Sequence, residues 1–467
     1  MLGDAKQDQA MMHFAAAKLG DKRRTDRLVR SVRHILEHPQ GSLPQKMNTH
    51  SELIGLYRLL DCDRVTHQAV QQPHRDLLRQ RLAQQSGVVL LVHDTTELDF
   101  SSIAALEDQL GQIGNGSGHG LLCHNTLVIT PDRNVLGLAA QVLHRRRKVP
   151  RNETPKAKRQ HPQRESRLWI KGCELAGAAP DGVGFVDVAD RGADSFEFIE
   201  HEHLQHRSYV IRACKDRNLE GLDHLGSDRI HHKLYAYARD LPQLGQRTLE
   251  LPATPKREAR TARLSVSAGP LQLRASRFAR GDCLGIELKL WVIRVAEIDA
   301  PAGQEPLEWV LLTDMAVLTL QQANQKIDYY CCRWTIEDFH KSIKTGLKIQ
   351  AMQLKDAARL EPMIGILSVV GAVLLELRDA AREPDAEFVP ATSRVPLLYV
   401  QILSHHWYKK LDEQMNIKQF VRDVARLGGF LGRKSDGSPG WQTLWRGWHE
   451  LHRMVQGALA FQQMRCV

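Results

Sequence analysis

Apolar residues at the beginning of the chain recur every three or four positions, which predicts helices up to about residue 80. In LGDKRRTDRLVRSVRHIL, Leu28, Val32 and Ile35 form an apolar face beneath a face of lysine and arginine. Such a cationic helix face is either solvated or in contact with a polyanion, and the pattern leaves both interpretations open. The helical pattern returns at Leu318 and continues to the end of the chain.

Unbroken apolar runs in the centre of the chain predict the strands of a sheet. VVLLVHD is typical of a buried strand, which we expect to end at Asp94, and GFVDVAD predicts a second strand that ends near Asp190. Residues 121–129 and 135–143 predict a hairpin, preceded by a glycine-rich segment that we expect to be a flexible connection. Asp94 and Asp190 thus follow core strands, the usual place for chemistry on an open sheet.

These elements predict an α/β protein with several domains, because 467 residues exceed what one hydrophobic core usually organises. We expect a helical domain at 1–80, a sheet domain at 81–380 and a helical domain at 381–467. Long alternation of apolar and polar residues predicts a β-rich insertion at about 218–307. No membrane partner is expected, because the longest uncharged apolar run, Met363 to Leu375, is too short to span a bilayer.

Charge and cysteine content narrow the class of protein. The formal net charge of +10 and the pI near 9.2 favour a polyanionic partner such as nucleic acid, although an ordinary basic protein has the same composition. The eight cysteines form no CxxC pair, and the N-terminus lacks the layout of a signal peptide. Reduced thiols and a cytoplasmic location are therefore expected.

One segment, YCCRWTIEDFHKSIK, combines a carboxylate with cationic and hydrogen-bonding residues. On a continuous α-helix, Tyr330, Arg333, Glu337 and Lys344 lie within about 60° of one another on one face. A solvated face of ion pairs has the same spacing. A site at this face becomes the better interpretation only if other catalytic residues meet it.

The two strand-end aspartates supply such residues. Asp94, Asp190 and Glu337 can converge on a pair of divalent cations, an arrangement that suits in-line displacement at phosphorus. Oxygen ligands favour Mg2+ or Mn2+ over zinc. Other nearby carboxylates are rivals for these roles: Glu97, Asp99, Asp187, Asp194 and Asp338.

Three motifs, HDTTELDF, DRGAD and the Tyr-x-x-Arg-x-x-x-Glu segment with a lysine after it, resemble the signatures of bacterial insertion-sequence transposases. The specific group is the insertion-sequence-four family, which includes the cut-and-paste transposase of transposon five. The resemblance runs nearly end to end, from LGDKRRTDRL through RWTIEDFHKSIKTG to ARLGGFLGRKSDGSPGWQTLWRGW.

This resemblance implies an RNase H-like mixed-sheet core with the catalytic triad Asp94, Asp190 and Glu337. It implies two Mg2+ ions, replaceable by Mn2+, that serve end cleavage through a DNA hairpin and then strand transfer into target DNA. The N-terminal domain would bind the terminal inverted repeats of double-stranded DNA. The C-terminal domain would pair two protomers as a homodimer, bound to DNA in the bacterial nucleoid.

The resemblance also assigns DNA contacts residue by residue. The residues expected to contact transposon-end phosphates are Tyr330, Arg333, Lys344 and Arg212. Those expected at a flipped base are Trp309 and Trp334, and those expected at the terminal repeat are Arg24 and Arg27. The chain departs from close relatives at Gly192, where they often carry glutamate. A structure-selective nuclease on the same core and a catalytically silent end-binding inhibitor are the alternative functions.

Overall fold

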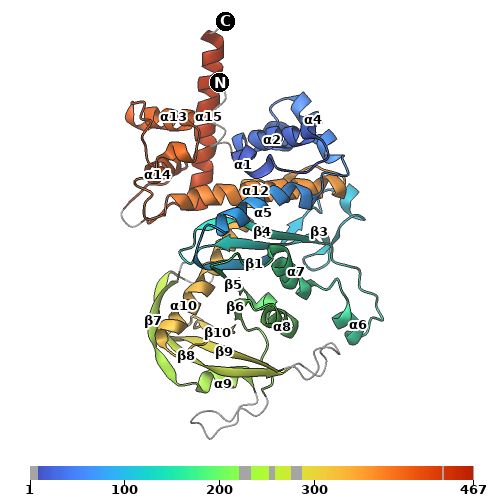
Figure 1. The fold of residues 1–467 in the computed structure, drawn as a ribbon, viewed down its shortest axis with the longest axis vertical. Coiled ribbons are helices and arrows are strands. Elements are labelled where there is room, and N and C mark those ends of the chain that lie inside the picture. Colours follow the sequence, from blue (N-terminus) through green and yellow to red (C-terminus); the bar gives the residue numbers. More distant parts are fainter. Residues whose placement is uncertain (1–8, 220–232, 252–257, 275–286, 434–435, 466–467) are drawn as a thin grey trace. The chain divides into compact units, whose positions relative to one another are not determined.

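The chain is described here by a computed structural model that covers residues 9–219, 233–251, 258–274, 287–433 and 436–465 (Figure 1). The chain forms two compact units. The terminal unit comprises residues 1–85, 95–148 and 335–467, and the central unit comprises residues 86–94 and 149–334.

The central unit contains a mixed sheet, as the sequence predicts. The first part of β1 pairs in parallel with β5, and β5 pairs in parallel with β6; antiparallel strands continue the sheet from β6. The apolar run of β1 is buried because parallel strands are covered on both faces. In sheet order the strands are β1 (Gly87–Asp99), β5 (Val183–Ala189), β6 (Ser208–Arg212), β10 (Glu308–Thr313), β9 (Glu287–Ile298), β8 (Arg260–Arg274) and β7 (Gln243–Leu251).

Helices cover this sheet. α10 packs on β5, β6 and β8, while α8 packs on β6 and on α7. α10 begins with a capping box in which Thr319 Oγ1 accepts from the backbone N–H of Gln322, and the Gln322 side chain accepts from that of Thr319. The helices are α6 (Pro155–Gln160), α7 (Leu168–Ala176), α8 (Phe196–Leu204), α9 (Leu234–Asp240) and α10 (Leu320–Cys331).

The expectation that the first strand ends at Asp94 is wrong. β1 continues to Asp99, and its second part belongs to the terminal unit, where it neighbours β3. Thr95 Oγ1 lies 2.8 Å from His124 Nδ1 of β3, and Leu98 is buried. The polar residues after Asp94 therefore extend the strand, because neighbouring side chains and strand β3 provide partners for their hydrogen-bonding groups.

The hairpin predicted in the terminal unit is confirmed by β3 (Gly118–Ile129) and β4 (Val135–His144). The glycine-rich segment before it is not merely a flexible connection, because β2 (Gly111–Ile113) pairs with β3 through a tight turn. A Cβ on Gly120 would lie 2.1 Å from the carbonyl oxygen of Leu98, so glycine is required where the strands approach.

The helices predicted for both ends of the chain are present. Leu28, Val32 and Ile35 are buried on α2, as the spacing predicts. α12 is long and apolar enough to cross a membrane, but 78% of its apolar window is buried against elements such as α5 and β4, as in a core helix. The helices are α1 (Gln9–Phe14), α2 (Lys22–Glu37), α3 (Leu43–Lys46), α4 (His50–Leu60), α5 (His67–Leu82), α11 (Thr335–Lys341), α12 (Ala357–Ala380), α13 (Leu397–Tyr408), α14 (Ile417–Leu427) and α15 (Trp441–Arg465).

Helices α13 to α15 share one apolar core. The tryptophan stripe of α15 packs within the chain: Trp441 and Trp445 are buried, and Trp448 stacks on Tyr399 at a centroid distance of 5.5 Å. α14 and α15 touch through backbone, since a Cβ on Gly447 would lie 1.7 Å from the carbonyl oxygen of Val424.

Gly447→Ala is therefore expected to destabilise the protein by about 1–3 kcal/mol or more, because the added methyl group forces the two helices apart. Thermal and chemical unfolding measure the effect. Gly457→Ala is the matched control on the same helix, since its Cβ would meet nothing within 4 Å. We expect it to leave stability unchanged or raise it slightly; equal behaviour of the two variants would contradict the packing described.

Candidate active site

The pairing of β1 with β5 places Asp94 beside Asp190. The last parallel pair in the register is His93 with Ala189, and each aspartate follows one residue later. Neighbouring strands lie about 4.8 Å apart, so the two carboxylates occupy adjacent positions at one edge of the sheet. Both belong to the central unit.

Asp190 is held in place by the turn that follows β5. Its Oδ1 accepts a 2.9 Å hydrogen bond from the backbone N–H of Gly192, capping a short 3-10 helix. A Cβ on residue 192 would lie 2.4 Å from the Trp169 ring and 3.0 Å from Asp190 Oδ1. The glycine in DRGAD thus fits the position of Trp169, a partner that the motif alone does not reveal.

A guanidinium group lies against the first aspartate. Arg333 Nη1 is 3.4 Å from Asp94 Oδ2, and the two side chains are only 10% and 15% exposed. Asp94 offers a carboxylate oxygen at the edge of the sheet, which is the type of ligand that Mg2+ takes in proteins. Oxygen donors on adjacent strands fit Mg2+ or Mn2+ in chemistry.

Tyr330 lies behind Arg333 at the end of α10 and is buried. Burial raises the pKa of its phenol, and the charge of Asp190 adds to this, while Arg212 and Arg333 oppose it. The phenol therefore stays protonated at neutral pH and remains a hydrogen-bond donor. Arg212, Arg333 and Asp190 therefore all lie close enough to Tyr330 in the central unit to act on its charge.

The remaining expected DNA contacts of this unit differ in exposure. Arg212, on β6, donates to the carbonyl oxygen of Glu308 at 3.0 Å. Trp309 is buried and packs edge-to-face on Tyr330 at 5.2 Å between ring centroids, as a core residue does. Trp334 is 61% exposed, with the Arg333 guanidinium 4.7 Å from its ring centroid. Of the two tryptophans, Trp334 is the one open to a base.

The assumption of one continuous α-helix from Tyr330 to Lys344 is wrong. α10 ends at Cys331, a 3-10 turn follows, α11 begins at Thr335, and a π-helical turn spans Ser342–Gly346. Each helix type turns by a different angle per residue, so the angles of an ideal wheel do not apply. Tyr330 and Arg333 belong to the central unit, and Glu337 and Lys344 to the terminal unit.

Within the terminal unit, Lys344 is half-buried near carboxylates. Burial lowers the pKa of its ammonium, while the charges of Glu97 and Glu337, among others, raise it. His340, which the sequence did not single out, lies one turn after Glu337 and is buried; its Nε2 is 3.1 Å from Asn125 Nδ2. His340 is thus fixed beside Glu337 by β3.

Each rival carboxylate has a structural task. Glu97 accepts from the backbone of Gly114, Asp99 from that of Ser101, Asp194 from those of Cys214 and Lys215, and Asp338 pairs with Arg378. The N-cap of α8 is Ser195, the residue after Asp194. The rivals are therefore occupied by the fold, and Asp187 is the most deeply buried of them.

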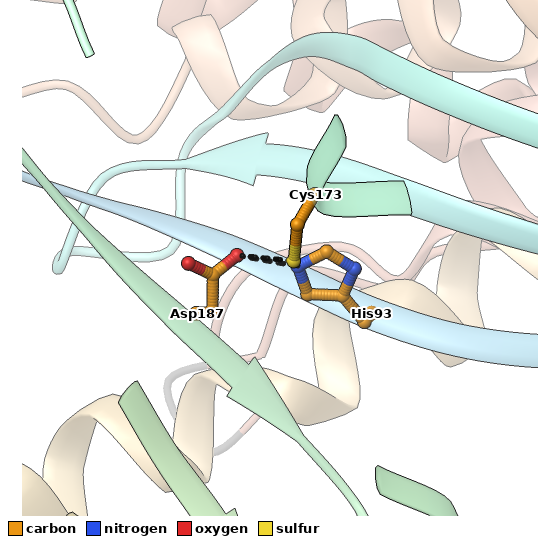
Figure 2. A group of neighbouring side chains, drawn as sticks. All are labelled: His93, Cys173 and Asp187. Atoms are coloured by element: carbon orange, nitrogen blue, oxygen red, sulfur yellow. Dashed lines mark hydrogen bonds and ion pairs between the residues drawn. The ribbon is translucent and has the colours of Figure 1, made fainter. Parts of the chain in front are cut away.

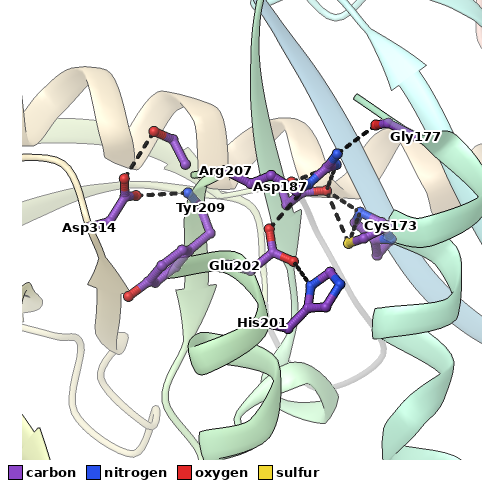
Figure 3. A network of polar contacts seen from close by, with 10 residues as sticks. Cys173, Gly177, Asp187, His201, Glu202, Arg207, Tyr209 and Asp314 are labelled. Atoms are coloured by element: carbon purple, nitrogen blue, oxygen red, sulfur yellow. Dashed lines mark hydrogen bonds and ion pairs between the residues drawn. The ribbon is translucent and has the colours of Figure 1, made fainter. Parts of the chain in front are cut away.

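Asp187 belongs to a buried network (Figures 2 and 3). Its Oδ1 lies 2.7 Å from His93 Nε2 and 3.5 Å from Cys173 Sγ, and Arg207 donates to both of its oxygens at 2.9 Å. Burial alone would raise the pKa of Asp187, but Arg207 and His93 outweigh it and hold that pKa below its usual range.

The three residues His93, Cys173 and Asp187 have the geometry of a metal cluster, with ligand atoms within 4.8 Å of one another. The protonation state of Cys173 argues against a bound metal ion. Burial and the charge of Asp187 raise the pKa of the Cys173 thiol well above its usual value, so the thiol stays protonated. Arg207 already supplies the positive charge, and the network ties β1 to β5 one residue before Asp94.

Comparison with known protein families agrees with this arrangement. Residues 184–370 match the transposase DDE domain, residues 7–65 match the transposase DNA-binding domain, and residues 372–464 match the transposase Tn5 dimerisation domain. The fold, the paired aspartates and these matches define a transposase of the DDE class, which acts on DNA by phosphoryl transfer and requires a divalent metal.

The chain is, more particularly, a Tn5-like DDE transposase, one that binds DNA and forms a homodimer. Asp190 and Glu337 lie inside the matched DDE segment, whereas Asp94 precedes it.

Proposed function

We propose that this transposase moves its DNA by a cut-and-paste route, with Asp94, Asp190 and Glu337 as its catalytic triad. The observation that carries the proposal is the adjacent placement of Asp94 and Asp190 at the end of their parallel pairing. The triad would hold two Mg2+ ions, which supply a Lewis acid at the scissile phosphate and an activated attacking oxygen.

Glu337 is added to the pair by the course of the chain. The Arg333 side chain reaches Asp94, and four residues of helical backbone lead from Arg333 to Glu337. At about 1.5 Å of rise per residue, their Cα atoms are only about 6 Å apart. This short connection supports a site in which the Glu337 carboxylate joins the two aspartates.

The residues around the triad would position the DNA strand. Arg333 has a fork of donors that matches a phosphate, and it lies beside Asp94, a carboxylate that would hold a metal ion. Its guanidinium would bind the transposon-end phosphate. Tyr330 would donate its protonated phenol to the same backbone, and Arg212 and Lys344 would bind further phosphates.

A hairpin intermediate requires a tightly bent strand, which is easier when one base leaves the stack. Exposed Trp334 offers an aromatic face to such a base, beside the guanidinium of Arg333. Buried Trp309 would support Tyr330 from behind. After hairpin opening, the freed 3′-hydroxyl would attack target DNA at the same three carboxylates.

End recognition would fall to the helical N-terminal domain, proposed to span 1–80. Arg24 donates to the carbonyl oxygen of Leu19 at 3.0 Å, and Arg27 pairs with Glu52 on α4. We assign both arginines to the terminal inverted repeats. Catalysis would fall to the domain at 81–380, which includes the β-rich insertion at 218–307. Pairing of protomers would fall to the domain at 381–467. The protein would be bound to DNA in the nucleoid.

End cleavage tests this proposal directly. The substrate is linear DNA that carries the sequences flanking the protein's own gene, incubated with the full chain and Mg2+. We expect double-strand release with hairpin ends on a denaturing gel, and none with EDTA. Cutting of branched DNA without dependence on those ends would contradict the proposal and favour a structure-selective nuclease.

Arg333→Ala is expected to slow end cleavage by about 10²–10³-fold, the usual cost of losing one charge-stabilising donor. The slope of log binding constant against log salt should become shallower by about 0.9, because one phosphate contact is lost. Binding titrations at several salt concentrations measure the slope. Arg263→Ala is the control, because Arg263 is an exposed arginine of β8 that pairs with Asp299, and this variant should leave the slope unchanged. An unchanged slope in Arg333→Ala would contradict the proposed phosphate contact of Arg333.

A further inference from the structure

A basic pocket lies in the C-terminal part of the terminal unit, within the segment that matches the dimerisation domain. Its volume is about 330 Å³, within the size range of ligand pockets. Five of its lining residues are cationic and none is acidic: Arg378, Arg382, Lys418, Arg422 and Arg433. They come from the end of α12, from α14 and from the segment after α14.

Ion pairs with carboxylates neutralise only part of the positive charge of this pocket. Arg378 is consumed by the fold, because its guanidinium donates to both oxygens of Asp379 and to Asp338. Lys418 pairs with Glu387, but both side chains are more than half exposed, so the pair is weak and exchangeable. Arg378 therefore forms a wall of the pocket, and Lys418 remains able to turn toward a ligand.

Three arginines retain the capacity to bind an anion. Arg382 shares Asp379 with Arg378 at 3.2 Å, and its pKa is lowered by burial and by repulsion from Arg378. Arg422 donates to the carbonyl oxygen of Gly432 at 3.0 Å. Among the described residues, neither Arg422 nor Arg433 forms an ion pair with a carboxylate. The C-terminus of α12 explains a cation at Arg378 or Arg382, but not at Arg422 or Arg433.

We propose that Arg382, Arg422 and Arg433, assisted by Lys418, bind a backbone phosphate of double-stranded DNA. Planar guanidinium forks match phosphate oxygens, and several forks around one pocket give a geometry that a solvated surface lacks. The pocket is open and lined by backbone at Gly432 and Gly437, both with positive φ, which lets a strand approach closely. The dimerisation region would thus also hold DNA.

This inference rests on the chain acting on DNA, but not on the chemistry of the triad. The test is therefore a binding measurement in EDTA with a 40-base-pair duplex of unrelated sequence, titrated at several salt concentrations. The variant is the full chain with Arg422→Gln and Arg433→Gln. One lost phosphate contact makes the salt slope shallower by about 0.9. An unchanged slope overturns the proposal, whatever the outcome of end cleavage by the unmodified protein.

Two further variants sharpen the measurement. Arg446→Gln with Arg453→Gln removes two exposed arginines from α15 in the same segment, and the slope is expected to stay as in the unmodified protein. An equal decrease in this control overturns the pocket, because general charge would then explain the effect. Arg422→Lys keeps the charge and is expected to retain the slope.

Small anions are a separate source of the same chemistry. Inorganic phosphate is added at constant ionic strength, and the thermal midpoint of the unmodified protein is compared with that of the Arg422→Gln, Arg433→Gln variant. If phosphate stabilises only the unmodified protein while the duplex slope is the same in both, the pocket binds a free anion and the assignment to DNA is overturned.

Discussion

Asp190→Asn is expected to reduce Mg2+-dependent end cleavage by about 10³-fold or more, because a phosphoryl-transfer site loses one of the negative charges that hold its metal ions. Asparagine keeps the oxygen that caps the backbone N–H of Gly192, so the turn after β5 should persist. DNA binding and the thermal midpoint should change little. Single-turnover cleavage of end-bearing DNA measures the effect.

Asp181→Asn is the matched control for this variant. It makes the same chemical change at the exposed turn before β5, at the other end of the strand from Asp190. We expect full activity. Cleavage by Asp190→Asn within tenfold of the unmodified protein would exclude Asp190 as a metal ligand.

Asp187→Asn is expected to lower the free energy of unfolding by about 3 kcal/mol, because the buried Arg207 guanidinium loses the carboxylate that accepts its 2.9 Å hydrogen bonds and keeps only Glu202, at 3.4 Å, as an acidic neighbour. His93 loses the charge of its acceptor as well. Chemical denaturation at neutral pH, followed by tryptophan fluorescence, measures the loss. The effect should be on stability first, since Asp187 is a fully buried residue of β5 and is not among the proposed DNA contacts.

The same control, Asp181→Asn, should unfold like the unmodified protein. A variant that removes both partners, Asp187→Asn with Arg207→Met, should recover part of the lost stability, because the guanidinium that lost its principal hydrogen-bond acceptor is then no longer buried. Equal stability of Asp187→Asn and the control would mean that the ion pair contributes nothing to the central unit.

Much of the fold follows from short-range patterns in the sequence. The buried strands of β1 and β5 were predictable because a strand covered on both faces must be apolar throughout. The position of Asp94 and Asp190 after those runs was predictable for the same reason. Their adjacency required the pairing of β1 with β5, which no local pattern contains.

Other features depended on contacts that the sequence does not display. β1 continues past Asp94 because β3 pairs with its polar half. The segment from Tyr330 to Lys344 changes helix type three times, from α to 3-10, back to α and then to π, and its apolar period does not show these changes. Asp187 was one of several rival carboxylates in the sequence, and its partner Arg207, twenty residues away, gave no signal that would separate it from the others.

Localised backbone cleavage tests whether Asp94, Asp190 and Glu337 hold the same metal ions. Fe2+ replaces Mg2+ in the complex with end-bearing DNA, and ascorbate with peroxide generates hydroxyl radicals at the bound ion. We expect three clusters of protein cuts, near residues 94, 190 and 337, that excess Mg2+ suppresses. Cuts near 94 and 190 without any near 337 would contradict a metal site shared by the three carboxylates.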